Sequence, residues 1–151
     1  MARAPWYRYG VLLPGYVVLA SSVSMIAGWM FEPKVFQGIV AGFGEIQPNS
    51  AMGFFLLAIA MLLLDSSRWP LRAVSRGCAL FVALIGALTI LEYLAGLNLG
   101  IDQWSFAGTS IAGSLYPGRM PPLTALNLML LVAAFLLLDW RWGRFSLAML
   151  L

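Results

Sequence analysis

The stretch that decides the fold is Pro122–Asp139, which reads PLTALNLMLLVAAFLLLD. A second stretch, Pro48–Asp65, reads PNSAMGFFLLAIAMLLLD, and the two align without a gap at an offset of 74 residues. The proline, an alanine, the leucine run and the closing aspartate coincide, and Ser50 corresponds to Thr124. An ungapped match of this kind indicates duplication of one structural unit rather than shared composition alone. We therefore expect a fold built from two copies of a helical hairpin.

The composition is that of a membrane protein. Of the 151 residues, 62% are hydrophobic and 10% are charged, whereas a soluble domain carries about 25% charged residues. A water-soluble globule of this size has no room to hide so much apolar surface. The sequence therefore predicts an all-α integral membrane fold.

The apolar runs divide the chain into four segments of membrane-helix character. We expect transmembrane helices at about residues 10–31, 49–65, 77–97 and 121–139, in a single membrane domain that covers residues 1–151. The connections are loops 32–48 and 98–120 and a short basic turn between the second and third helices. A cleaved signal peptide is the alternative for the first run, but its apolar core would be about 7–15 residues long, and this run is longer.

The basic residues predict the orientation. Of the nine basic residues, seven are expected on one side of the membrane and two on the other. The seven are Arg3, Arg8, Arg68, Arg72, Arg76, Arg141 and Arg144, and the two are Lys34 and Arg119. Loops rich in lysine and arginine stay in the cytoplasm. Both termini are therefore expected there, and the two repeated helices then run in the same direction, as duplication of a hairpin requires.

Several kinds of chemistry are excluded by what the sequence lacks. It contains no histidine and one cysteine, Cys78. Without imidazole there is no haem ligand and no histidine to activate a serine or cysteine nucleophile. No metal cluster, paired carboxylates or phosphate-binding loop stands out. We expect no enzyme, no catalytic residue, no cofactor, no metal site and no nucleic-acid partner.

One carboxylate, Glu92, lies inside an apolar segment, where a charged side chain is costly and often functional. Asp102 and Arg119 follow in the next connection and are expected within its reach. Glu92 with these neighbours is either a ligand or proton site at the outer mouth of the bundle, or a structural ion pair between Glu92 and Arg119 that anchors the long loop. We favour the ion pair, because Glu92 is only a turn or two from the interface.

Asn127 is the remaining candidate polar residue. It follows the start of the fourth helix by about one turn, among Leu126, Leu128 and Met129. Its ordinary role is a hydrogen bond between helices, worth about 0.6–2 kcal/mol in a membrane. A ligand contact is the alternative.

Part of the chain resembles a known family. The segments LEYLAGLNLGIDQWSF at Leu91–Phe106 and PGRMPPLTALNLMLLVAAFLLLD at Pro117–Asp139 resemble the N-terminal multi-helix membrane segment of bacterial sensor histidine kinases and diguanylate cyclases. PNSA at 48–51 is similar to the same start in the earlier repeat. The resemblance covers roughly residues 48–139 and implies a sensory module that passes a signal to an output domain. No such domain follows Leu151 in this sequence, which puts transmission in doubt.

Two functions follow as expectations. The first is a non-enzymatic, sensor-like membrane module of the bacterial cytoplasmic membrane, with loops 32–48 and 98–120 in the periplasm. The alternative is an accessory or scaffolding subunit of a larger respiratory or photosynthetic membrane complex. A small transporter is disfavoured, because such sites need polar residues near the bilayer midplane. Expected partners are the lipid bilayer, and other membrane proteins or a second copy through the transmembrane helices.

Overall fold

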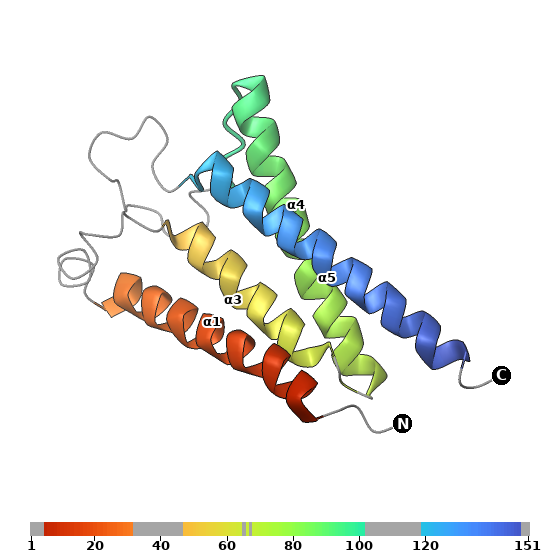
Figure 1. Ribbon diagram of the computed structural model, residues 1–151. Coiled ribbons are helices and arrows are strands. Elements are labelled where there is room, and N and C mark those ends of the chain that lie inside the picture. Colours follow the sequence, from red (N-terminus) through yellow and green to blue (C-terminus); the bar gives the residue numbers. More distant parts are fainter. Residues whose placement is uncertain (1–4, 32–46, 65, 67, 102–118, 149–151) are drawn as a thin grey trace.

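The computed structural model describes residues 5–31, 47–64, 66, 68–101 and 119–148 (Figure 1). These residues form four helices and no strand: α1 (Pro5–Phe31), α3 (Pro48–Leu63), α4 (Trp69–Ala95) and α5 (Pro122–Ala148). Neighbouring helices in the chain run in opposite directions, and α3 and α5 run in the same direction. The described part of the chain is therefore all-helical, as predicted.

Two of the helices are long and apolar enough to cross a membrane: α4, and α5 between Pro122 and Trp140. Only 28% and 22% of the residues in their apolar windows are buried inside the molecule, whereas the core helix of a soluble protein is mostly buried. Apolar runs in α1 (Leu12–Gly28) and α3 are shorter. At 1.5 Å per residue the 16 residues of α3 span about 24 Å, less than the hydrocarbon thickness of about 30 Å.

Prolines begin the helices at the predicted places. Pro48 and Pro122, which coincide in the sequence repeat, are the first residues of α3 and α5. Proline suits the first turn of a helix, because its missing N–H would have no partner inside the helix there. The repeat therefore marks two equivalent helix starts.

The basic turn predicted between the second and third helices is corrected by the structure. Helix α4 begins at Trp69 rather than Gly77, with Pro70 in its first turn. Arg72 and Arg76 consequently lie on the first turns of α4. Likewise α5 continues past Asp139 to Ala148. Arginine is a good helix former, so both helices extend beyond their apolar runs.

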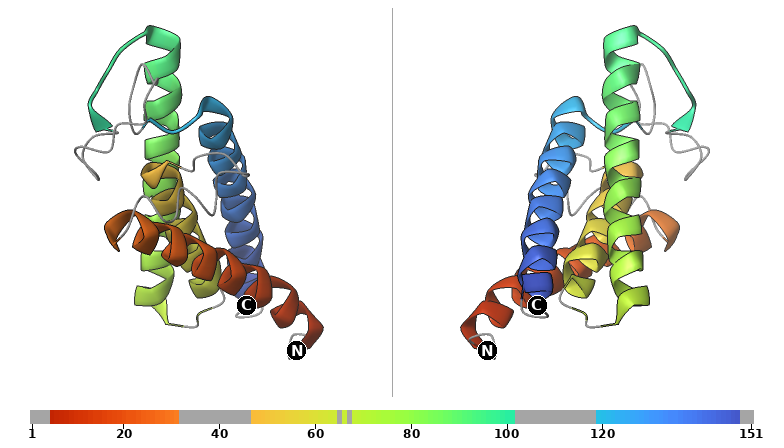
Figure 2. Two further views of the ribbon diagram at one scale, coloured as in Figure 1. Left: turned by 90° about the vertical axis from the view of Figure 1, so that its left-hand side faces the viewer. Right: turned by 90° about the vertical axis from the view of Figure 1, so that its right-hand side faces the viewer.

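The apolar core lies between α3, α4 and α5. Its fully buried residues include Ala60 of α3, Val82 of α4 and Leu128 of α5. Helix α1 packs against α3, where Gly15 faces Leu62. Figure 2 shows that α1 crosses the other helices obliquely. The hairpin of α4 and α5 is therefore packed on one side by α3, and no described helix packs on its opposite side.

The two ends of the bundle differ. The start of α1, the α3–α4 connection and the end of α5 lie together at one end (Figures 1 and 2), which we call the arginine end after Arg68, Arg72 and Arg76. The end of α4 and the start of α5 lie at the opposite end, which we call the Glu92 end. Helix α1 thus begins, and α5 ends, on the same side of the bundle.

Candidate functional site

The candidate site at the Glu92 end begins where α4 stops. Gly96 adopts a left-handed conformation (φ 63°), and its N–H and that of Leu97 both donate to the carbonyl oxygen of Glu92. A glycine in this conformation is a common helix stop, because it has no Cβ to clash. Gly100 is also left-handed (φ 71°). These two glycines turn the chain back over the last turn of α4.

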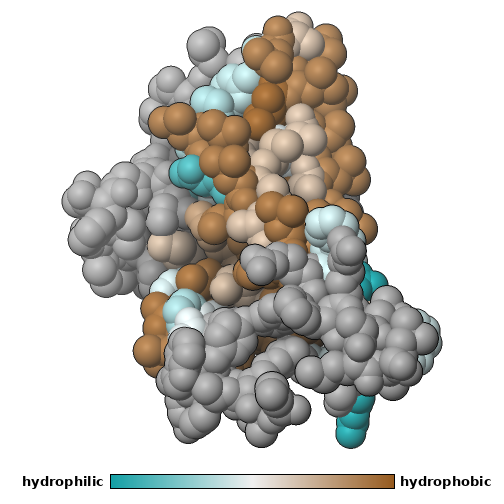
Figure 3. Space-filling model, turned by 45° about the vertical axis from the view of Figure 1, so that its right-hand side comes forward, coloured by the Kyte–Doolittle hydropathy of each residue, from teal (hydrophilic) through white to brown (hydrophobic). Residues whose placement is uncertain are grey.

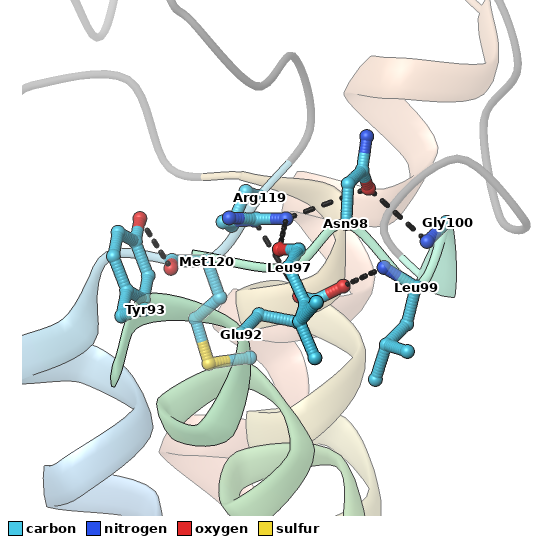
Figure 4. Close-up of polar contacts among 8 residues, drawn as sticks. All are labelled: Glu92, Tyr93, Leu97, Asn98, Leu99, Gly100, Arg119 and Met120. Carbon is cyan, nitrogen blue, oxygen red and sulfur yellow. Dashed lines mark hydrogen bonds and ion pairs between the residues drawn. The ribbon is translucent and has the colours of Figure 1, made fainter. Parts of the chain in front are cut away.

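Glu92 is completely buried in the last turn of α4, at 0% exposure. Its Oε1 accepts a hydrogen bond of 2.6 Å from the N–H of Leu99, which the glycine turn brings back to it. Its Oε2 lies 3.4 Å from Nε of Arg119 (Figure 4). No described group donates a hydrogen bond to Oε2, so its contact with Arg119 is one of charge. The carboxylate is therefore fixed at one oxygen and balanced by charge at the other.

Arg119 is almost as deeply buried, with 2% of its side chain exposed. Its Nη2 donates to the carbonyl oxygen of Leu97 at 3.1 Å and to Oδ1 of Asn98 at 3.4 Å. The guanidinium carbon lies 5.4 Å from the centre of the Tyr93 ring, a distance at which an aromatic face attracts a cation. Arg119 thus joins the start of α5 to the end of α4 through charge, hydrogen bonds and an aromatic ring.

Tyr93 provides a further link between the two helices. Its hydroxyl donates to the carbonyl oxygen of Met120 at 3.3 Å (Figure 4). Met120 is fully buried and belongs to the apolar core. The end of α4 therefore holds two residues of the segment before α5, Arg119 by its side chain and Met120 by its backbone.

Three buried side-chain oxygens of the bundle have no hydrogen-bond partner among the described residues. They are Oε1 of Gln47, Oγ of Ser50 and Oε2 of Glu92. Gly53 faces Leu128, and Gly86 faces Ala125 and Met129. Gln47 and Glu92 are each six residues, about 9 Å along a helix, from these glycines. Both residues therefore lie at the Glu92 end, close to the start of α5.

Of the four predicted site residues, the structure brings two together. Glu92 and Arg119 form the expected ion pair, and whether the pair is structural or binds a ligand stays a prediction. Asp102 lies outside the described residues. Asn127 is exposed on α5 and forms no hydrogen bond within the described part of the chain, and the interhelical bond stays a prediction. Asn127 is exposed because α5 is turned so that a different face of the helix, which carries Leu128, packs against the rest of the bundle.

The sequence interpretation missed three participants in the site, namely the carbonyl of Leu97, the amide of Asn98 and the N–H of Leu99. Two of these are backbone groups, which carry no residue-type signal. The glycines Gly96 and Gly100 on either side were the available clue, because they mark a chain reversal.

A second ion pair joins the same two helices at the arginine end. Nε of Arg76 donates to Oδ2 of Asp139 at 2.7 Å, and Nη2 donates to Oδ1 at 3.4 Å. This two-point contact is geometrically specific, but Arg76 is half exposed. Asp139 is the closing aspartate of the sequence repeat. The hairpin of α4 and α5 is therefore bridged by opposite charges at both ends.

Within the described ranges, no group of three or more acidic or cysteine side chains is placed to hold a metal ion. Comparison with known proteins gives no match: no family model, no curated protein sequence and no solved structure is significantly similar to this chain.

Proposed function

We propose that the chain is a non-enzymatic signal-input module of a bacterial cytoplasmic membrane, in which the α4–α5 hairpin passes a signal from the Glu92 end to the arginine end. The observation that carries the proposal is the pair of bridges on one hairpin. Glu92–Arg119 joins the helices at one end, and Arg76–Asp139 joins them at the other. The family resemblance in residues 48–139 points to the same kind of module.

The two bridges differ in strength, which suits transmission. The Glu92–Arg119 pair is buried, so a change in its charge or contacts alters a large interaction energy. The Arg76–Asp139 pair is partly exposed, and such pairs contribute little to stability. A shift of α5 that begins at the buried pair therefore meets little resistance at the exposed one. Shifts of helices in switching proteins are about 1–2 Å.

The signal enters, in this proposal, at the buried polar side chains of the Glu92 end. The unpartnered oxygens of Gln47, Ser50 and Glu92 are all able to accept a hydrogen bond. A small hydrogen-bond donor that reached them would compete with Arg119 for the Glu92 carboxylate.

The membrane arrangement proposed here has four crossings, with both termini and the arginine end in the cytoplasm. It is supported by the apolar exposed side chains of α4 and α5, by the shorter apolar runs of α1 and α3, and by the arginines gathered at one end. Helix α3, at about 24 Å, crosses by packing between its neighbours and by local thinning of the bilayer.

The topology is tested by labelling single cysteines from outside the cell. In a Cys78→Ala background, a membrane-impermeant maleimide should label Leu99→Cys at the Glu92 end and should leave Gly10→Cys unlabelled until the membrane is opened. Both positions are exposed, and a Cβ at Gly10 meets no atom within 4 Å. Labelling of Gly10→Cys in intact cells would overturn the orientation.

The class of function is tested by recovering the tagged native gene product from its own membranes in mild detergent. Signal input predicts a product heavier than the 16.5 kDa of this chain, with kinase or cyclase sequence attached. A product of 16.5 kDa that arrives in fixed proportion with a large respiratory or photosynthetic complex would favour the accessory-subunit alternative. A solitary 16.5 kDa product would contradict both.

A further inference from the structure

The open face of α5 carries a regular seam. Its members follow one another at alternating spacings of four and three residues, and every one of them is exposed: Leu123, Asn127, Leu130, Ala134 and Leu137. Alternation of four and three places side chains along one line of a helix and is the spacing by which two helices pack side by side. We call this set the Asn127 seam.

The Asn127 seam is distinct from the face with which α5 packs in its own chain. That inner face consists of Ala125, Leu128, Val132 and Phe135, all buried. At 3.6 residues per turn, the two sets point to opposite sides of the helix. Leu123, Leu130 and Leu137 are 74%, 59% and 60% exposed. No described segment of the chain covers the seam, and Figure 3 shows that one face of the molecule is largely apolar over its described residues.

Asn127 is the polar member of the seam, and contact with lipid does not satisfy its amide. Its amide forms no hydrogen bond within the described part of the chain. It lies five residues, about 7.5 Å, beyond the start of α5, so it falls inside the hydrocarbon once α5 crosses the membrane as proposed above. An exposed amide there has no water to bond with, and polar groups in lipid are normally satisfied by a neighbouring helix.

We propose that a second copy of this chain covers the Asn127 seam, so that two α5 helices pack around a two-fold axis with their Asn127 amides bonded to each other. An amide carries both donors and an acceptor, and is therefore complementary to an identical amide across a two-fold axis, where each residue meets its own copy. A single polar residue in an apolar helix seam also fixes the register of the two helices. Ala134, one small residue within the seam, lets the backbones approach.

The test is disulfide cross-linking of the full chain in membranes, in a Cys78→Ala background. Leu130→Cys and Ala134→Cys place a thiol on the seam. Leu84→Cys on α4 is the matched control, because it is exposed and apolar and lies two residues from Gly86, which faces Met129, at nearly the same depth. The seam cysteines should give a product of twice the chain mass under mild oxidation, and the control should not.

The role of the amide is tested by dimer affinity in lipid vesicles of increasing dilution. Asn127→Ala should raise the dissociation constant about 3- to 30-fold, the range that membrane hydrogen bonds of this kind span, and Asn127→Gln should preserve most of the affinity. Circular dichroism checks that the variants stay folded. A monomer at all dilutions, equal cross-linking of Leu84→Cys, a cross-link to a different protein, or an unchanged affinity of Asn127→Ala would overturn the proposal. Maleimide labelling of Leu99→Cys and Gly10→Cys separately tests the membrane arrangement on which this inference rests.

Discussion

At the buried pair Glu92–Arg119, we predict that a second substitution restores part of the stability that the first one removes. Arg119→Met keeps an apolar stem of similar length but leaves the Glu92 carboxylate, at 0% exposure, without a counter-charge. Removing one partner of a buried pair costs about 3–5 kcal/mol. We therefore expect Arg119→Met to lower the free energy of unfolding by about that amount.

Glu92→Gln should cost less. Its carbonyl oxygen can still accept the N–H of Leu99, and Arg119 keeps Leu97, Asn98 and the ring of Tyr93. The bond from Leu99 then ends on a neutral oxygen in place of a charged one, and a hydrogen bond to a charged group is worth about 1.5–3 kcal/mol against about 1 kcal/mol for a neutral one. The variant therefore stays folded.

The combined variant Glu92→Gln with Arg119→Met contains no buried charge at this site. It should be more stable than Arg119→Met alone, so that the second substitution rescues the first. Unfolding in rising mole fractions of sodium dodecyl sulfate, followed by circular dichroism, measures all three. Leu94→Ala, on the same helix at 83% exposure, is the control and should change stability by less than about 0.5 kcal/mol. If the two substitutions simply add, the ion pair does not anchor this end of the hairpin.

Three further predictions use the same unfolding assay. Gly53→Val should cost about 1–3 kcal/mol, because a Cβ there comes within 2.7 Å of Leu128. Gly77→Ala should be neutral or stabilise by up to about 1 kcal/mol, because a Cβ there meets no atom within 4 Å. A larger loss of stability in Gly77→Ala than in Gly53→Val would mean that α3 and α5 do not pack at Gly53. Ser75→Ala should cost about 1 kcal/mol, because the serine hydroxyl on α4 donates to the carbonyl of Ala60 on α3 at 2.7 Å. An unchanged stability of Ser75→Ala would mean that this hydrogen bond does not hold α4 to α3. Arg76→Gln should cost less than about 1 kcal/mol, with a difference from the unsubstituted chain that shrinks in high salt; a large, salt-independent loss would mean that the pair with Asp139 is buried.

The helices were predictable because the signals for them are local. Apolar runs and first-turn prolines identify α3 and α5 to within one residue at their starts, Pro48 and Pro122. The ends were less predictable. The sequence predicts interfacial turns at the arginines before Gly77 and after Asp139, yet both stretches are helical. Charged side chains are costly in lipid, but arginine is a good helix former, so the helices continue beyond their apolar runs.

The sequence was sufficient to predict the charge pair of the site, but not the backbone hydrogen bonds that fix it. The sequence predicts that Glu92 and Arg119 meet, because Arg119 lies in the connection that follows Glu92 and carries the opposite charge. The hydrogen bond from Leu99 depends on the left-handed turns at Gly96 and Gly100, which a sequence only hints at. The exposure of Asn127 depends on the rotation of α5. Leucines lie all around this helix, so composition alone does not reveal that Leu128 faces inward and Leu130 outward.

The central claim, that the α4–α5 hairpin carries a change from the Glu92 end to the arginine end, is tested most directly by a spin-label distance. Labels at Gly10→Cys on α1 and Leu138→Cys on α5, in a Cys78→Ala background diluted with unlabelled chain, report the position of the end of α5. Glu92→Gln should shift the mean distance by about 1–2 Å, and Asp139→Asn should change that response. An unchanged distance distribution in a Glu92→Gln protein whose stability is lowered would show that the buried pair anchors the hairpin without transmitting anything along it.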